Sequence, residues 1–189
     1  MSDADRDRWN ARWLERAGDS LSEPAPWIAS LDPILPRSGS ALDIAGGAGR
    51  HAVWLARRGL EVTLVDVSGE GLRLAARAAA AAGVSIELVE RDLEREPLPA
   101  GPWDVALCYH YLERALFPVI ADALTPGGHL AFCQPTRSNL ERNPRPGSAF
   151  LLDDGEAPSL VAGLEIVSYT EGWVAEGRHE ARLVARRRS

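Results

Sequence analysis

The sequence predicts an α/β protein built on a doubly wound, mostly parallel sheet. Strand-like and helix-like patterns alternate through most of the chain, a glycine-rich turn at residues 43–49 joins a buried strand to a helix, and two further strand patterns end the chain. Strand–helix–strand alternation implies parallel strands with right-handed crossovers and helices on both faces of the sheet. Ligands of such sheets bind at the carboxyl ends of the strands, near the switch in strand order.

Each predicted element has a local signal. Ser68 is a good N-terminal cap for a helix, and Gly59 and Gly83 end helices because glycine adopts the left-handed conformation that follows a last helical turn. Short β-branched runs bounded by turn residues predict strands, and residues 125–128 predict a turn. The predicted strands are 40–45, 61–66, 84–90, 103–108 and 129–133, the hairpin strands are 164–174 and 179–187, and the helices are 49–58, 68–82 and 118–124.

The composition predicts one domain over residues 1–189 and excludes several function classes. A chain of this length buries a substantial core without disulfides or metals. Its formal net charge of −6 argues against non-specific nucleic-acid binding, which neutralises phosphates with basic side chains. All 21 basic residues are arginine, which excludes a P-loop lysine and Schiff-base chemistry.

The chain ends and the cysteines predict a cytoplasmic protein. Residues 1–8 are mostly charged and do not resemble an apolar signal segment, and no apolar run reaches the roughly 20 residues of a membrane span. We therefore expect no membrane partner. Cys108 and Cys133 form no CxxC pair, so we expect reduced thiols and no metal site.

The glycine turn predicts a ligand site at the end of the first strand. Glycine lets the backbone approach a ligand closely, and the helix that follows offers free N–H groups to polar or anionic atoms. One alternative is an ordinary strand–helix turn. A second is a dinucleotide site, because residues 47–52 also fit the pattern G-x-G-x-x-A.

Three acids follow successive strands. Asp43 precedes the turn, where a carboxylate opposes a pyrophosphate but suits a ligand with an ammonium group and a sulfonium. Asp66 ends the second strand and is placed to accept hydrogen bonds from ribose hydroxyls, in either kind of cofactor. Asp92 follows the third strand, either to accept from an adenine amino group or as a solvated loop acid.

The ordered motifs resemble class I S-adenosylmethionine-dependent methyltransferases. Residues 41–56 resemble the family's first motif, in a form most similar to the small bacterial tellurite-resistance-type group, although Ala45 stands where the first glycine is usual. Residues 62–68, 103–108 and 124–130 resemble the second strand, the fourth strand and the turn before the fifth. The resemblance implies S-adenosylmethionine as cofactor and a Rossmann-like, seven-stranded sheet whose C-terminal hairpin supplies an antiparallel strand. The predicted cofactor-binding residues are Trp13, Asp43, Ala45, Gly46, Gly47, Gly49, Arg50, His51, Asp66, Val67, Asp92, Leu93 and Cys108.

The exit of the fourth strand is where the methyl group should emerge. We predict Tyr109 and His110 as catalytic residues, with His110 a candidate base and Tyr109 or Tyr111 a candidate cation–π partner of the sulfonium. A soft thiolate, selenide or telluride acceptor needs no base, whereas nitrogen and oxygen acceptors often do. The alternative is that these rings only wall the cofactor pocket.

Two segments are predicted to close the site. Residues 1–35 form an N-terminal helical lid whose Trp9 and Trp13 share one helix face, or they only dock that helix on the sheet. Residues 135–157 form a substrate-side loop, or a solvated one. Its arginines, on the first interpretation, favour an acidic acceptor; they are Arg137, Arg142 and Arg145.

The predicted function is methyl transfer from S-adenosylmethionine to a small-molecule acceptor. Two alternatives stay open at this point: an NAD(P)-binding oxidoreductase, and a non-catalytic S-adenosylmethionine-binding protein. A single domain leaves no room for the second domain that most dehydrogenases carry, which favours the methyltransferase. The sequence makes no prediction of the oligomeric state.

Overall fold

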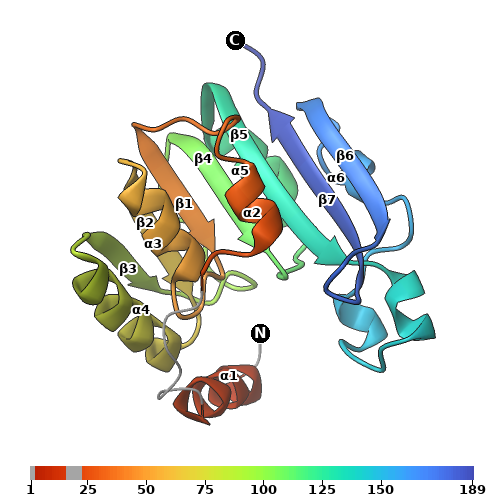
Figure 1. Ribbon diagram of the computed structural model, residues 1–189, viewed down its shortest axis with the longest axis horizontal. Helices are drawn as coiled ribbons and strands as arrows, with labels where there is room; N and C mark the ends of the chain where they lie inside the picture. The colour runs from red at the N-terminus through yellow and green to blue at the C-terminus, as the bar shows by residue number, and fades with distance from the viewer. Residues whose placement is uncertain (1–2, 16–22) are drawn as a thin grey trace.

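The computed structural model describes residues 3–15 and 23–189 of the chain. Its centre is a seven-stranded sheet in the order β3-β2-β1-β4-β5-β7-β6. The first five strands pair in parallel, and β7 runs antiparallel to both β5 and β6 (Figure 1). The strands are β1 (Ser40–Ile44), β2 (Glu61–Asp66), β3 (Ile86–Glu90), β4 (Trp103–Tyr109), β5 (Leu124–Pro135), β6 (Glu165–Trp173) and β7 (His179–Arg186).

Helices cover both faces of the sheet, as the alternation of elements predicts. Strand residues point alternately to the two faces, so Ala41 packs in one hydrophobic cluster and its neighbour Leu42 in the other. One cluster lies under α2, α3 and α4, and the other under α5 and α6. The helices are α1 (Asp3–Glu15), α2 (Pro26–Ser30), α3 (Arg50–Arg57), α4 (Gly69–Ala82), α5 (Leu116–Ala123) and α6 (Ala157–Leu160).

The predicted capping residues are confirmed. The Ser68 side chain accepts a hydrogen bond from the backbone N–H of Gly71 at 3.1 Å, which starts α4, and Gly83 ends that helix with φ of 68°. The Gly59 turn, with φ of 100°, follows α3. The fold class is therefore the predicted one, a Rossmann-like mixed sheet with an antiparallel hairpin strand.

Some boundaries differ from the prediction. The predicted turn at 125–128 lies within the span of β5, because Gly127 and Gly128 exchange backbone hydrogen bonds with Arg187 while the pairing with β4 is interrupted. The predicted loop 135–157 contains two 3-10 helices, η1 (Arg137–Glu141) and η2 (Ser148–Phe150). The composition of these segments predicts a turn and a loop, but it contains no signal for the two short helices.

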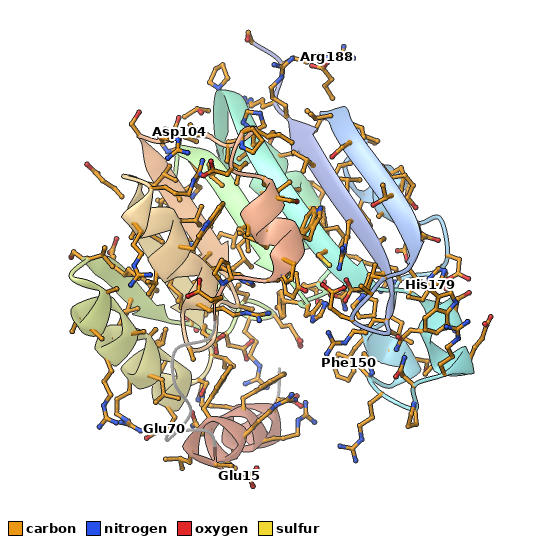
Figure 2. The ribbon with its side chains drawn as sticks, in the orientation of Figure 1. Glu15, Glu70, Asp104, Phe150, His179 and Arg188 are labelled. Atoms are coloured by element: carbon orange, nitrogen blue, oxygen red, sulfur yellow. The ribbon has the colours of Figure 1, made fainter. Side chains whose placement is uncertain are left out.

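The carboxyl ends of the five parallel strands meet at one edge of the sheet, and α1 lies beyond that edge (Figure 1). Figure 2 places His179 and Phe150 at this same edge and Asp104 at the opposite one. Of the lid 1–35, residues 1–2 and 16–22 lie outside the described residues. Within 3–15 and 23–189, no helix is both long and apolar enough to cross a membrane.

Candidate cofactor and acceptor site

A cavity of about 580 Å³ lies at the carboxyl ends of β1, β2 and β4. This volume is within the range of roughly 300–1,000 Å³ typical of small-molecule sites. Its walls come from α1, the glycine turn, α4, the segments after β2, β3 and β4, and the turn between β6 and β7. The cavity therefore lies where the sequence predicts a ligand site, at the carboxyl ends of the parallel strands.

The glycine turn wraps the floor of this cavity in an unusual backbone conformation. Ala45, Gly47 and Gly49 have φ of 54°, 55° and 78°, all in the left-handed region. Gly49 is the N-cap residue of α3 and has no side chain to cap the helix, so the first N–H groups of α3 receive no capping bond from it, and that of Ala52 bonds to Asp43 instead. Ala45 holds its left-handed φ at a cost of roughly 1–2 kcal/mol that glycine would avoid.

Asp66 connects the turn to the end of β2. Its Oδ2 accepts a hydrogen bond from the backbone N–H of Gly47, and its Oδ1 accepts one from Ser68, each at 2.8 Å. Burial raises the pKa of Asp66, and these backbone N–H donors lower it. Each carboxylate oxygen has a second lone pair, so the group is still able to accept from a diol at the cavity wall.

Asp43 is the most unusual acid of the site. It is 1% exposed, and its Oδ2 is buried without a hydrogen-bond partner among the described residues. Burial raises the pKa of Asp43 to about 7, with the backbone N–H of Ala52 opposing that shift. A buried carboxylate with a free oxygen is costly unless a cation or donor reaches it, which marks this position for a ligand.

Three rings and a guanidinium form the wall next to β4. The Tyr109 ring lies 4.8 Å from His51 and 4.1 Å from His110, measured between centroids, and Arg50 lies 5.3 Å from the Tyr109 centroid. Burial raises the pKa of Tyr109 and lowers the pKa of His51 to about 3. The Nε2 atom of His51 accepts a hydrogen bond from the backbone N–H of Ala25 at 3.3 Å, so this neutral ring also anchors the start of α2.

His110 sits at the exit of β4 and is bound to the last strand. Its Nε2 lies 2.8 Å from Oε1 of Glu180, a carboxylate whose side chain is 1% exposed. Burial lowers the pKa of His110, and Glu180 opposes this. The other carboxylate oxygen of Glu180 contacts Arg182 at 3.1 Å and the Cys133 sulfur at 3.3 Å.

Helix α1 forms the outer wall of the cavity. Trp13 packs between the turn and α4 so closely that a Cβ on Gly47 would lie 2.4 Å from its ring. Asn10 fixes the helix to the start of α4, because its Oδ1 accepts hydrogen bonds from the Ser68 hydroxyl at 2.7 Å and the Glu70 N–H at 3.3 Å. The helix thus docks on α4, where the alternative interpretation expected the sheet, and Trp9 and Trp13 both line the cavity. That this helix closes the site as a lid stays a prediction.

The predicted site residues line this cavity, with Asp92 and Cys108 as exceptions. Asp92 is 4% exposed and binds the backbone N–H of Glu94 at 3.1 Å, while Cys108 is 3% exposed and packs in the core. Their predicted cofactor contacts stay predictions. The residues brought together are Trp13, Asp43, Ala45, Gly46, Gly47, Gly49, Arg50, His51, Asp66, Val67, Leu93, Tyr109 and His110.

The arginines of the segment 135–157 are placed elsewhere. Arg137 pairs with Asp153, and Arg142 lies 4.0 Å from the centroid of the Trp173 ring. Neither these two nor Arg145 lines the cavity. The arginine that does reach it from the C-terminal part of the chain is Arg178, in the turn between β6 and β7.

Sequence reasoning missed Arg178 and Glu180, and also the apolar wall that α4 provides. That wall was readable in part, because Leu74, Ala78 and Ala81 repeat at helical spacing after the acid Asp66. The places of Arg178 and Glu180 had no such signal, because they depend on how β7 pairs with β5.

The methyltransferase domain family model matches residues 41–128, the part of the chain that contains the turn and β1 to β4. A ubiquinone biosynthesis O-methyltransferase of Cronobacter sakazakii is 30% identical over an alignment of 187 residues, which covers 93% of this chain and 70% of the relative. The chain belongs to the class I S-adenosylmethionine-dependent methyltransferases. A second ubiquinone biosynthesis O-methyltransferase, from Sodalis glossinidius, is 34% identical over 151 residues. That alignment covers 71% of this methyltransferase and 57% of the relative's length.

Solved structures share the fold of this methyltransferase at low sequence identity. A protein of echinomycin biosynthesis, studied in the conversion of a disulfide bond into a thioacetal group, has a TM-score of 0.75 at 17% identity and covers 97% of this chain and 92% of that chain. TehB of Haemophilus influenzae has a TM-score of 0.74 at 16% identity, over 95% and 67% of the two chains. The S-adenosylhomocysteine-bound magnesium protoporphyrin IX methyltransferase of Synechocystis has a TM-score of 0.72 at 20% identity, over 98% of each chain.

The cavity of this methyltransferase fits the cofactor of its family. The buried Oδ2 of Asp43, to which no described residue donates, suits an ammonium group, and Asp66 next to it suits a ribose diol. Family membership decides against the NAD(P)-binding oxidoreductase that the pattern G-x-G-x-x-A left open.

Proposed function

We propose that the protein transfers the methyl group of S-adenosylmethionine to a small-molecule acceptor at the wall formed by Tyr109 and His110. The observation that carries this proposal is the buried Oδ2 of Asp43, which makes no hydrogen bond within the described part of the chain, beside a glycine turn in left-handed conformation. When bound, S-adenosylmethionine supplies an electrophilic methyl group on a sulfonium. Alignment of donor and acceptor in one cavity contributes on the order of 7–11 kcal/mol at best to lowering the barrier.

Each wall has a role in this proposal. Asp43 would bind the ammonium end of the donor, Asp66 the ribose hydroxyls, and the apolar face of α4 the adenine ring, next to Leu93. Trp13 lines the outer side of the cavity and would shield the charged donor from water. The acceptor then enters on the side of His110 and Arg178.

The small-molecule acceptor draws support from two sides. The curated relatives are ubiquinone biosynthesis O-methyltransferases, and the volume of the cavity is of small-molecule size. The closer likeness to the tellurite-resistance-type group stays a prediction, because TehB at 16% identity shares the fold alone.

Calorimetry tests the donor half of the proposal. S-adenosylhomocysteine should bind with micromolar affinity, Asp43→Asn should weaken that binding, and NADH should give no heat. Binding of NADH without S-adenosylhomocysteine would overturn the proposal. Binding of S-adenosylhomocysteine with no methyl transfer to any of a broad panel of phenols, thiols, amines and carboxylic acids would favour the non-catalytic binding protein instead.

A further inference from the structure

We propose that the acceptor presents a protonated oxygen or nitrogen to His110, and that Glu180 positions the His110 ring so that its Nδ1 atom accepts that proton. This inference rests on the proposed function. It adds the chemical class of the acceptor and a positioning residue from β7, outside the matched family segment 41–128.

The Glu180 carboxylate is built into the protein as a fixed acceptor. It is almost fully buried, and Arg182 and Cys133 occupy its Oε2 while Oε1 faces His110 Nε2 at 2.8 Å. Burial raises the pKa of Glu180, but the bond to His110, the Cys133 thiol and Arg182 lower it to about 2. The carboxylate is therefore ionised throughout the working pH range.

The backbone aims His110 at this carboxylate. His110 has a φ of 60°, in the left-handed region, and its N–H donates to the carbonyl oxygen of Cys133 at 2.8 Å. A left-handed conformation in a residue with a side chain costs roughly 1–3 kcal/mol and is concentrated at functional sites. The conformation turns the ring away from the strand direction, toward β7 on one side and the cavity on the other.

The bond to Glu180 determines which ring nitrogen is basic. A carboxylate that contacts Nε2 keeps the proton of the neutral ring on Nε2, just as a hydrogen-bond acceptor at one ring nitrogen fixes the tautomer of histidines in other proteins. Among residues 3–15 and 23–189, no group makes a hydrogen bond to Nδ1, and the side chain is 27% exposed and lines the cavity. Nδ1 is thus the lone pair that an acceptor in the cavity would meet.

The charges around His110 keep it ready as a base. Burial lowers its pKa, Glu180 raises it, and Arg178 and Arg50 lower it further, so the ring is neutral near pH 7. A soft, already ionised acceptor would have no use for a neutral base held in this way. The charged and titratable groups that face His110 are Glu180 and Arg182 of β7, Cys133 of β5, Arg178 of the hairpin turn, Tyr109 of β4, and Arg50 and His51 of α3.

The proposed step is balanced without a further reactant. The acceptor O–H or N–H proton moves to Nδ1 of His110, and the electron pair it leaves forms the bond to the methyl carbon. The electron pair of the broken carbon–sulfur bond stays on sulfur, which becomes neutral. The imidazolium so formed is paired with the Glu180 carboxylate, which lowers the cost of its charge in a buried place.

The first test needs no acceptor. Imidazole ¹⁵N spectra of the S-adenosylhomocysteine complex should show His110 as the Nε2–H tautomer with an unprotonated Nδ1 at pH 7. In Glu180→Gln, the titration of His110 should move to lower pH, because the charge that raises its pKa is gone. Glu176→Gln is the matched control: Glu176 also pairs with Arg182, at 3.3 Å, but does not contact His110. An Nδ1–H tautomer in the wild-type complex would overturn the proposal.

The second test uses catechol as a hydroxyl acceptor and thiophenol as a thiol acceptor. With catechol, kcat should rise with pH as His110 loses its proton. Glu180→Gln should lower the plateau about 10–100-fold and move that rise to lower pH, while Glu176→Gln changes neither. A purely structural role would lower the plateau and leave the pH of the rise in place, which overturns the proposal.

Two further outcomes are decisive. Methylation of thiophenol alone, unaffected by His110→Asn, would overturn the proposal in favour of a soft acceptor. If neither compound is methylated, the tautomer and titration of His110 decide alone. If the wild-type protein does not bind S-adenosylhomocysteine, the proposed function itself is contradicted. Failure of the proposed function and failure of the inference about His110 are therefore distinguishable.

Discussion

Gly49 and Ala75 bring the start of α3 against α4 so closely that a Cβ on Gly49 would lie 2.7 Å from the Cβ of Ala75. The same glycine holds a φ of 78° as the N-cap of α3. Two independent requirements therefore fall on one residue of the turn, one on its backbone and one on its packing. The contacted atoms of Ala75 are its Cβ and Cα, which no rotation of a side chain can move away, so the backbone itself would have to move.

Gly49→Ala should lower the free energy of unfolding by about 2–4 kcal/mol. Two costs add up in this variant: a residue with a Cβ must adopt the left-handed conformation, and the new Cβ overpacks the contact between α3 and α4. Denaturant unfolding measures this loss. Gly83→Ala is the matched control, with φ of 68° and no atom within 4 Å of the added Cβ. It should lose only about 1–2 kcal/mol. Equal losses in the two variants would contradict the packing requirement.

Asp43→Asn should stabilise the protein at neutral pH. In the folded protein the carboxyl keeps its proton up to about pH 7, whereas the unfolded chain releases it near pH 3.8. The folded state binds more protons between these values, so the wild type loses stability as the pH rises through them. Asparagine removes that slope, and the gain at pH 7 is a few kcal/mol, at about 1.4 per pKa unit. Unfolding curves at pH 4 to 8 that run parallel for both proteins would contradict the raised pKa of Asp43.

Cofactor binding should be linked to the same proton. An ammonium group next to Asp43 favours the carboxylate, so S-adenosylhomocysteine should release a proton when it binds below pH 7, and its affinity should rise with pH up to about 7 and then level off. Calorimetry in buffers of different ionisation enthalpy counts the released protons at pH 6. Asp43→Asn should show neither the proton release nor this pH dependence. Proton release that persists in the variant would assign it to another group.

Trp13→Ala should weaken S-adenosylhomocysteine binding about 10–100-fold, because an aromatic wall of the cavity contributes roughly 1.5–3 kcal/mol through its buried surface. Fluorescence or calorimetric titration measures the change. Leu14→Ala, on the same helix but 54% exposed, is the control and should bind as the wild type does. Unchanged affinity in Trp13→Ala would show that α1 docks on α4 without closing over the ligand.

The predictions from sequence succeeded where the signal is local. The cap at Ser68, the left-handed ends at Gly59 and Gly83 and the acids at the strand ends each depend on a few neighbouring residues. The glycine turn and Asp66 could be assigned to one cavity because parallel strands bring their carboxyl ends together. This local information was enough for the fold and for bringing most of the predicted cofactor-binding residues to one cavity, while their contacts with a cofactor stay predictions.

The acceptor side depends on pairing between distant segments. Glu180 reaches His110 because β7 pairs with β5 in a register that sets Pro135 opposite Glu180, and a shift of one residue would turn Glu180 to the other face. At Asp92 a local contact matters instead. Its carboxylate accepts a hydrogen bond from the backbone N–H of Glu94, and this donor competes with any ligand for the carboxylate. Tertiary register and local competition of this kind have no signature in composition or spacing.

In the proposed arrangement, the hairpin of β6 and β7 is a separable unit of specificity. The groups proposed to bind the donor all precede residue 128, where the family model ends, whereas Arg178 and Glu180 come after it. Evolution is then free to vary the hairpin while the donor half stays unchanged, so relatives that share a recognisable first half are expected to differ in what they methylate. Exchange of the hairpin between two such relatives is the corresponding route to an enzyme with a new acceptor.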